Sequence, residues 1–218
     1  MTKVMVGFVS VLLTIQMQSQ EIPEREKYYT IINAAIEETI YMQQKAIRLN
    51  EIHSGKESFA MVKGMNFTDG IIEVEVAGKP LPTANAAARG FIGIAFRLTT
   101  VDTIRYDCFY LRPSNGRADD QLRRNHSTQY IAHPSFPWYR LRKEFPGVYE
   151  SYVDLVEGEW TKVRIEVKGK QAKLFVHGSE QPALIVTELL GSEISGGVAL
   201  WVGQGTDGYF RNLKITGR

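Results

Sequence analysis

The amino-acid sequence predicts an all-β fold, an antiparallel sandwich or barrel, with a short helix ahead of it. Apolar residues alternate with polar or small ones through most of the chain, which is the period of β-strands. Turn-forming pairs such as Asp69-Gly70 and His177-Gly178 separate the alternating runs. No helical pattern lies between consecutive runs, as expected for an all-β sandwich.

The predicted elements form one domain behind an N-terminal extension. Apolar side chains between Glu24 and Ile40 recur at helical spacing, so a short amphipathic helix is expected within residues 20–44. From Lys45 the period changes to two, and a single β-domain is expected over residues 45–218, because undivided sandwiches commonly reach this size. Strands are predicted at 45–50, 57–63, 70–77, 90–98, 104–112, 127–132, 160–168, 171–177, 183–187, 196–203 and 208–216.

The first 19 residues have the pattern of an export signal. Lys3 precedes a mainly apolar run from Val4 to Ile15, and the chain then turns polar before Ser19. The run is shorter than the roughly 20 residues that a membrane span needs. The sequence therefore predicts an exported protein, periplasmic or extracellular, without a stable membrane span. An uncleaved N-terminal helix packed on the domain remains the alternative.

Charge and cysteine content exclude two further classes of protein. The formal net charge is only +2, so no general attraction to nucleic acid is expected. Cys108 is the single cysteine, which rules out a disulfide scaffold within the chain. Because Cys108 lies in an apolar run, we expect a buried, unreactive thiol.

Two predicted strands have an unusual second face. In GFIGIAFRL, Ile92 and Ile94 share one face, while Gly93 and Arg97 share the other. In GGVALWVG, Trp201 likewise stands among glycine and alanine. Small residues beside one large aromatic or Arg predict a ligand groove, with a tightly packed covering layer as the alternative.

The segment from Arg105 to Tyr152 is crowded with Arg, Tyr, His, Asn and Gln. A connection this long is uncommon unless it is functional or disordered. Disorder is disfavoured because the segment is rich in aromatic residues. Flat apolar faces and fixed hydrogen-bonding groups suit a polar ring-shaped ligand such as a sugar. We therefore expect an ordered binding segment.

The sequence is similar to a bacterial group of concanavalin A-like lectin/glucanase domains, often grouped with the 3-keto-disaccharide hydrolase type. The similarity is carried by FTDGIIEVEVAG, FIGIAFR, EWTKVRIEVKGKQAKLFVHG, GGVALWVGQGTDGYFRNLKI and above all the central segment from RPSNG to PGVYE. The resemblance implies a jelly-roll sandwich with a glycan groove across one sheet. The E-x-D-x-x-E pattern of the superfamily's retaining glucanases is absent, so their chemistry is not expected here. No cofactor is predicted, and a structural Ca²⁺, present in parts of the superfamily, is not located by this sequence.

Three residues are candidates for catalysis. Glu73 and Glu75 are two apart on one predicted strand, so their carboxyls are about 7 Å apart on the same face. That spacing suits an inverting glycosidase, whereas the alternative is a pair of solvated surface residues. His126 is a candidate general base, because the pKa of histidine lies near physiological pH. No metal-binding pattern is present.

Arginine, aromatic and amide side chains supply the candidates for substrate binding. An Arg guanidinium can donate two hydrogen bonds to sugar oxygens, and a Tyr ring can stack on a sugar ring. The alternative is that these side chains hold the long segment against the domain. The predicted binding residues are Arg97, Tyr106, Tyr110, Arg112, Arg117, Gln129, Trp138, Arg140 and Trp201.

These observations together predict a carbohydrate ligand and leave open whether the domain also cleaves a glycosidic bond. The resemblance favours a bond activated by a 3-keto group. The alternative is a non-catalytic, lectin-like module that binds a glycan or a partner protein. No nucleic-acid partner and no particular oligomeric state are predicted.

Overall fold

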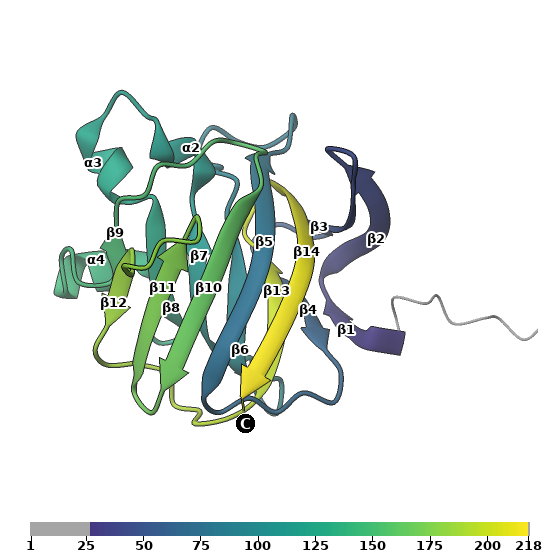
Figure 1. Cartoon of the computed structure of the whole chain (residues 1–218), viewed down its shortest axis with the longest axis vertical. Helices are drawn as coiled ribbons and strands as arrows, with labels where there is room; N and C mark the ends of the chain where they lie inside the picture. Colours follow the sequence, from purple (N-terminus) through teal and green to yellow (C-terminus); the bar gives the residue numbers. More distant parts are fainter. Residues whose placement is uncertain (1–26, 218) are drawn as a thin grey trace, which may run out of the picture.

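A computed structural model describes residues 27–217 as a sandwich of two antiparallel sheets (Figure 1). The predicted export signal, residues 1–19, lies outside the described residues. Each sheet has seven strands. Within residues 27–217, no helix is long and apolar enough to cross a membrane.

We call the two layers sheet A and sheet B. In spatial order, sheet A consists of β1 (Tyr29–Ile32), β4 (Ser58–Val62), β13 (Gly197–Val202), β6 (Ile92–Thr99), β7 (Arg105–Leu111), β8 (Thr128–His133) and β9 (Glu150–Ser151). Sheet B consists of β12 (Leu184–Val186), β11 (Gln171–Val176), β10 (Thr161–Lys168), β5 (Gly70–Pro80), β14 (Thr206–Gly217), β3 (Gln44–Glu51) and β2 (Ala34–Tyr41).

Alternation along the strands builds the core between the sheets. Ile92 and Ile94 on β6 are fully buried on the inner face, and Ile72 of β5 and Ile165 of β10 are paired in sheet B. Because successive side chains leave a strand on opposite sides, the residues between these positions face outward. The all-β fold class and the predicted strands from residue 45 onward are thereby confirmed. Cys108 is buried as expected, and burial raises the pKa of its thiol.

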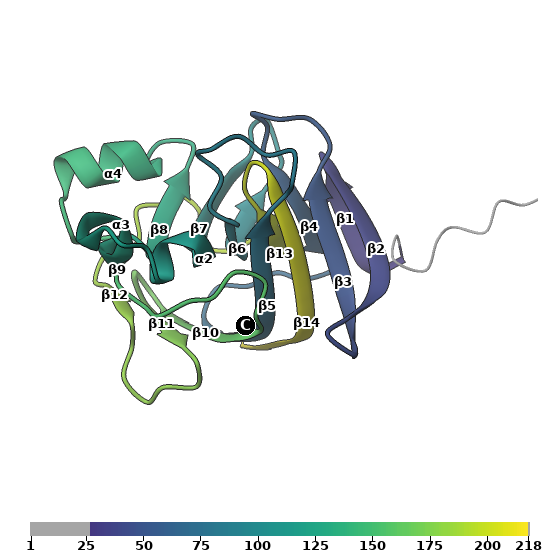
Figure 2. The same ribbon diagram turned by 90° about the horizontal axis from the view of Figure 1, so that it is seen from above.

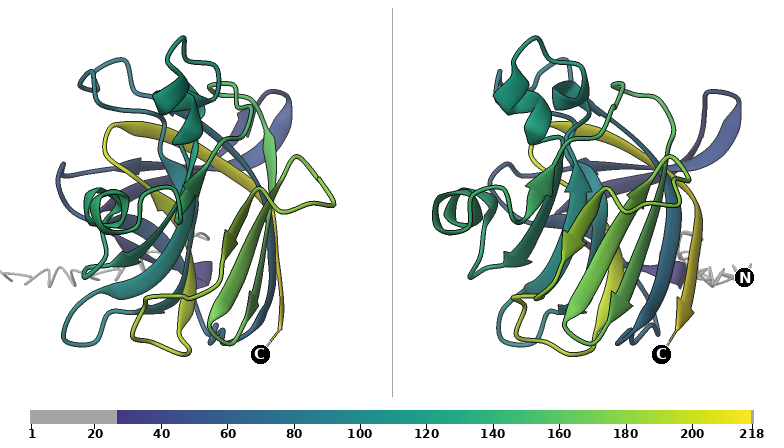
Figure 3. Two further views of the ribbon diagram at one scale, coloured as in Figure 1. Left: turned by 90° about the vertical axis from the view of Figure 1, so that its left-hand side faces the viewer. Right: turned by 60° about the vertical axis from the view of Figure 1, so that its left-hand side comes forward.

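The aromatic segment from Arg105 to Tyr152 contains β7, β8 and β9. Two connections, which we call excursions, lie before and after β8. The first carries α2 (Pro113–Gly116) and α3 (Gln121–Asn125), and the second carries α4 (Trp138–Glu144). Figures 2 and 3 show α4 on the outer side of sheet A, away from sheet B. β8 itself pairs with β7, so the segment is not one continuous loop.

The helix expected between Glu24 and Ile40 was a wrong prediction where the structure describes this region. Residues 29–32 and 34–41 form β1 and β2, which pair with β4 and β3. Asn33 breaks the run with a left-handed φ of 47°, which sends the two strands to different sheets. The apolar residues that looked helical therefore belong to two strands, and both sheets extend ahead of residue 45.

A tight turn also joins β2 to β3. Its central residues Met42 and Gln43 both have positive φ, 48° and 63°. Two-residue hairpins need this backbone, which Asn-Gly or Asp-Gly pairs adopt most easily. Met-Gln gives no such signal, so the hairpin was hard to see in the sequence.

Candidate functional site

A cleft of about 600 Å³ lies on the outer face of sheet A. Its volume falls in the range of about 300–1,000 Å³ that is typical of small-molecule sites. Sheet A supplies the floor, and α4, the excursion around α3 and the loops at 54–57 and 85–89 supply the walls. The lining residues are Gly55, Lys56, Glu57, Asn85, Ala87, Ala88, Arg89, Phe91, Tyr110, Arg112, Asn115, Arg123, His126, Ile131, His133, Pro137, Trp138, Arg142, Trp201, Val202, Gly203 and Gln204.

An aromatic pair forms part of the floor. Gly93 of β6 lies in register with Tyr110 of β7 and with Trp201 of β13. A Cβ at Gly93 would lie 2.7 Å from the Cβ of Tyr110, so glycine makes this close approach possible. The rings of Tyr110 and Trp201 meet with centroids 5.0 Å apart. The predicted combination of a small residue with large aromatics therefore builds this part of the cleft.

Arg112, at the end of β7, places a buried cation in the cleft. Its side chain donates to the Tyr110 hydroxyl at 2.8 Å and to Oε1 of Gln129 at 3.1 Å. A third bond of 3.0 Å reaches the carbonyl of His126. The guanidinium carbon also lies 5.9 Å from the ring of Trp138. Only 4% of Arg112 is exposed, and this burial lowers the pKa of the guanidinium.

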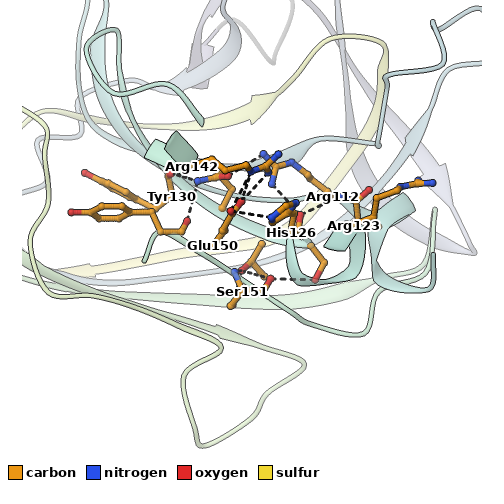
Figure 4. A network of polar contacts seen from close by, with 12 residues as sticks. Arg112, Arg123, His126, Tyr130, Arg142, Glu150 and Ser151 are labelled. Atoms are coloured by element: carbon orange, nitrogen blue, oxygen red, sulfur yellow. Dashed lines mark hydrogen bonds and ion pairs between the residues drawn. The ribbon is translucent and has the colours of Figure 1, made fainter. Parts of the chain in front are cut away.

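The first of two carboxylates in the region belongs to Glu150 of β9 (Figure 4). Arg142 of α4 donates to both carboxylate oxygens, at 2.8 to 3.2 Å. Nε2 of His126 lies 3.1 Å from Oε1. Burial lowers the pKa of His126 and outweighs the opposite effect of Glu150, so the neutral imidazole is favoured.

The second carboxylate belongs to Glu57, in the loop before β4. It accepts hydrogen bonds from the Tyr106 hydroxyl and, at 3.2 Å, from Nε1 of Trp201. Nδ1 of His133 lies 3.5 Å away, and its ring stacks on Tyr106 with centroids 5.0 Å apart. Burial lowers the pKa of His133. Each of these two carboxylates is thus accompanied by a histidine whose neutral form is favoured.

Five of the predicted site residues line the cleft, namely Tyr110, Arg112, His126, Trp138 and Trp201. Two further predicted residues, Tyr106 and Gln129, lie directly behind the residues that line the cleft. Tyr106 is buried and hydrogen-bonded to Glu57 and Trp201. Gln129 is fully buried, accepts from Arg112, and donates to the carbonyls of Tyr130 and Tyr149.

Arg97 does not lie in the cleft, contrary to the expected strand parity. It adopts a φ of 50°, and the pairing of β6 with β7 shifts register between Phe96 and Thr99. This β-bulge turns the side chain away from the face of Gly93. The guanidinium instead donates to the carbonyls of Thr68 and Gly169 and to Asp69.

Glu73 and Glu75 also lie elsewhere, on the outer face of sheet B. Glu75 is held by Arg211 at 2.6 Å and by Asn212 at 2.9 Å, and these contacts lower its pKa against the effect of burial. Nζ of Lys214 lies 3.7 Å from Glu73. Neither carboxylate lines the cleft, because β5 belongs to the opposite layer.

Arg117 and Arg140 are outside the cleft as well. Arg117 forms a bidentate, exposed ion pair with Asp154. Arg140 pairs with Glu144 one helical turn away on α4 and lies over the ring of Phe136. Both are surface contacts that hold their own segments.

Sequence reasoning missed several polar residues of the cleft, among them Glu57 and Arg142, and also Glu150, which holds Arg142 and His126 from behind. Glu57 lies far from the aromatic segment in the chain and reaches the cleft only through pairing of β4 with β13. Glu150 lies near the end of the aromatic segment, where a carboxylate that directly follows Tyr149 was the available signal. In the part of the chain that the structure describes, no three His, Cys, Asp or Glu side chains gather as a metal site would require.

No protein-family model and no curated protein sequence matches this chain. Solved structures with similar folds do exist. The carbohydrate-binding module CBM66 from Bacillus subtilis is 14% identical over 85% of this chain and 92% of that one, with a TM-score of 0.56. A Bacillus subtilis protein of unknown function with a galectin-like fold is 10% identical over 88% and 91%, with a TM-score of 0.53. The VIP36 exoplasmic/lumenal domain, in a Ca²⁺/Man3GlcNAc-bound form, is 10% identical over 89% and 86%, with a TM-score of 0.52. These likenesses confirm the predicted jelly-roll sandwich of two antiparallel sheets.

Proposed function

We propose that this protein binds a saccharide in the cleft on sheet A. The observation that carries the proposal is the arrangement of Tyr110, Trp201 and Trp138 around the buried fork of Arg112. Aromatic faces pack against the apolar side of a sugar ring, while a fixed guanidinium holds its oxygens. Among the similar folds are a carbohydrate-binding module and a domain bound to Man3GlcNAc, which supports this choice of ligand.

Trp138 offers the most direct test of binding. It is 45% exposed at the start of α4, so its ring is available to a ligand. Its neighbour Tyr139 is also exposed but does not line the cleft. On a glycan array followed by calorimetric titration, Trp138→Ala should weaken binding about tenfold, because one stacking contact contributes roughly 1–1.5 kcal/mol. Tyr139→Ala should bind like the parent protein. Equal losses in both variants, or no glycan binding by the parent protein, would overturn the proposal.

Glycosidic bond cleavage is a second candidate function, favoured by the placement of His126 between Glu150 and the cleft. With the Nε2 proton directed at Glu150, Nδ1 of a neutral His126 can accept a proton. In a 3-keto-glycoside, it would take the proton from C2 beside the ketone. The electron pair then forms the C1–C2 double bond as the glycosidic C1–O bond breaks. The departing oxygen takes up a proton, and addition of water to the unsaturated sugar completes hydrolysis.

The same region supplies positive charge for such a step. Arg112 and Arg142 lie near His126 and would stabilise the enolate oxygen that develops from the ketone. Product release from a 3-keto-glucoside by the parent protein, lost in His126→Gln, would support an enzyme. His177→Gln is the control, because His177 lies outside the cleft. Binding of the 3-keto-glucoside without product would leave a non-catalytic module.

An exported location completes the proposal. It is supported by the apolar run from Val4 to Ile15 behind Lys3. Intact-mass measurement of material recovered outside the cytoplasm should show a chain that begins near residue 20. Recovery of the chain with Met1 would contradict cleavage.

A further inference from the structure

We propose that the saccharide is acidic, with a carboxylate or sulfate group held by Arg112, Arg89 and Arg123. This inference rests on the proposed function and specifies its class of ligand. It follows from the balance of charge in the cleft, from the burial of Arg112 and from an unpartnered amide beside it.

The cleft contains more positive than negative charge. Its cationic side chains are Lys56, Arg89, Arg112, Arg123 and Arg142, and the carboxylate that lines it is Glu57, while Glu150 lies behind His126 and Arg142. Glu150 neutralises Arg142 through a bidentate pair, while Glu57 is engaged by the Tyr106 hydroxyl and the indole of Trp201. Within residues 27–217, neither Arg89, Arg112 nor Arg123 forms an ion pair with a carboxylate. None of these three guanidiniums therefore has a carboxylate at ion-pair distance, although the charges of Glu157 and Glu150 act on Arg89 and Arg112 from farther away.

Arg112 is the least solvated of the three. All its hydrogen-bond partners are neutral: the Tyr110 hydroxyl, the Gln129 amide oxygen and the His126 carbonyl. A buried charge without an opposite charge is unfavourable, because it has lost its hydration. An anion that entered the cleft would restore the missing interaction, and a planar guanidinium can hold a carboxylate or sulfate by two hydrogen bonds.

Arg89 and Arg123 bring further positive charge to the same place from separate segments. Arg89 comes from the loop between β5 and β6, where it donates to the carbonyls of Ala86 and Ala88. Arg123 comes from α3. Burial lowers the pKa of Arg89, and the charges of Arg123 and Arg112 lower it further against the opposite effect of Glu157. The three cations therefore repel one another in the unliganded cleft, and a bound anion would reverse this repulsion.

Asn115 lies beside Arg112 and contributes to the lining of the cleft. The residue is 5% exposed, and its Nδ2 donates to the His126 carbonyl, which also accepts from Arg112. Its Oδ1 has no donor in the structure and is itself buried. A sugar hydroxyl next to the anionic group would supply a donor once the Asn115 side chain turns toward the cleft.

The test uses matched saccharides that differ only in charge. Trigalacturonate is titrated against its carboxyl-reduced counterpart, and a sulfated galactose trisaccharide against its desulfated form, each at low and high salt. We expect at least one acidic member to bind about tenfold or more tightly than its neutral partner, the effect of one charge-assisted hydrogen bond. The preference should shrink at high salt.

Variants then show which side chains cause the preference for acidic over neutral saccharides. Arg89→Gln and Arg123→Gln together should reduce the acidic preference about tenfold with little effect on the neutral sugar, because both side chains are partly exposed. Arg112→Lys should reduce it further, with folding checked by circular dichroism. The control is Arg117→Gln, which removes one charge from the same excursion outside the cleft and should leave the preference unchanged.

The outcomes separate this inference from the proposed function. Neutral sugars that bind as tightly as acidic ones would overturn the acidic ligand and leave saccharide binding intact. Absence of binding to every saccharide would overturn both. If Arg117→Gln lost the acidic preference as much as the Arg89 and Arg123 variant, the overall charge of the protein would be responsible. That result would also overturn the proposed anion site. Tighter binding of a single-stranded oligonucleotide than of any acidic sugar would assign the cleft to another ligand.

Discussion

Nε2 of His126 lies 3.1 Å from Oε1 of Glu150, a contact that joins the two excursions flanking β8. His126 ends the excursion that carries α3, and Glu150 follows the one that carries α4. Arg142 binds the same carboxylate from α4. One buried charge thus connects both excursions to the edge of sheet A, as Figure 4 shows.

Glu150→Gln is expected to destabilise the protein. The substitution leaves Arg142 without its carboxylate and removes the group that supports a proton on His126. Loss of one partner from a buried pair costs about 3 kcal/mol, and somewhat less here because Arg142 is partly exposed. Urea denaturation gives the change in unfolding free energy. Glu144→Gln, which breaks the exposed pair with Arg140, should change it by less than about 0.5 kcal/mol. Equal effects would contradict a structural role for Glu150.

Asp107 is expected to make stability depend on pH. Burial between the sheets raises its pKa to about 6, against the opposing effects of Tyr130, Arg97 and Gly191. The folded protein therefore holds a proton that the unfolded chain, with a pKa of 3.8, releases. The contribution of Asp107 is most favourable below pH 3.8 and declines as the pH rises through about 6. A pKa difference of about 2 corresponds to about 3 kcal/mol.

The comparison of Asp107→Asn with the parent protein isolates this effect. The difference in unfolding free energy between the two should change across pH 4 to 6 and stay constant above pH 7. Unfolding curves measured in urea across this range test the prediction. A difference that does not vary with pH would show that Asp107 titrates normally.

Arg97→Lys should lower stability without weakening ligand binding. A lysine ammonium cannot reach the carbonyls of Thr68 and Gly169 while also meeting Asp69, all of which Arg97 contacts. Loss of these charge-assisted bonds should cost about 2 kcal/mol. Thermal unfolding and glycan titration on the same sample separate the two effects. Weakened binding with unchanged stability would place Arg97 in the site after all.

Gly93→Ala should disturb the aromatic floor. The new Cβ would lie 2.1 Å from the carbonyl oxygen of Phe109 and 2.7 Å from the Cβ of Tyr110, so β6 and β7 must move apart. Overpacking of this kind costs about 1–3 kcal/mol. The near-ultraviolet circular dichroism of the Tyr110–Trp201 pair should change together with the stability. A variant with the parent spectrum and stability would mean that the strands yield easily.

The sequence by itself determined the strand pattern and part of the cleft. Period-two alternation placed the isoleucines of β6 inside and the face of Gly93 outside, because successive side chains must leave a strand on opposite sides. The same rule put Tyr110 and Trp201 on that outer face, where register brings them together across Gly93. The crowding of Arg and aromatic residues after β7 likewise predicted where Arg112, His126 and Trp138 would gather.

Only the tertiary structure decided the remaining features, because they depend on contacts between distant segments. The β-bulge at Arg97 reverses the expected side-chain direction, and no local residue signal announces it. β1 and β2 form strands because β4 and β3 offer them partners, although their apolar spacing also suits a helix. Glu57 meets Trp201 through sheet pairing alone. Local alternation specifies which face a side chain takes, whereas strand pairing and bulges specify which charges meet.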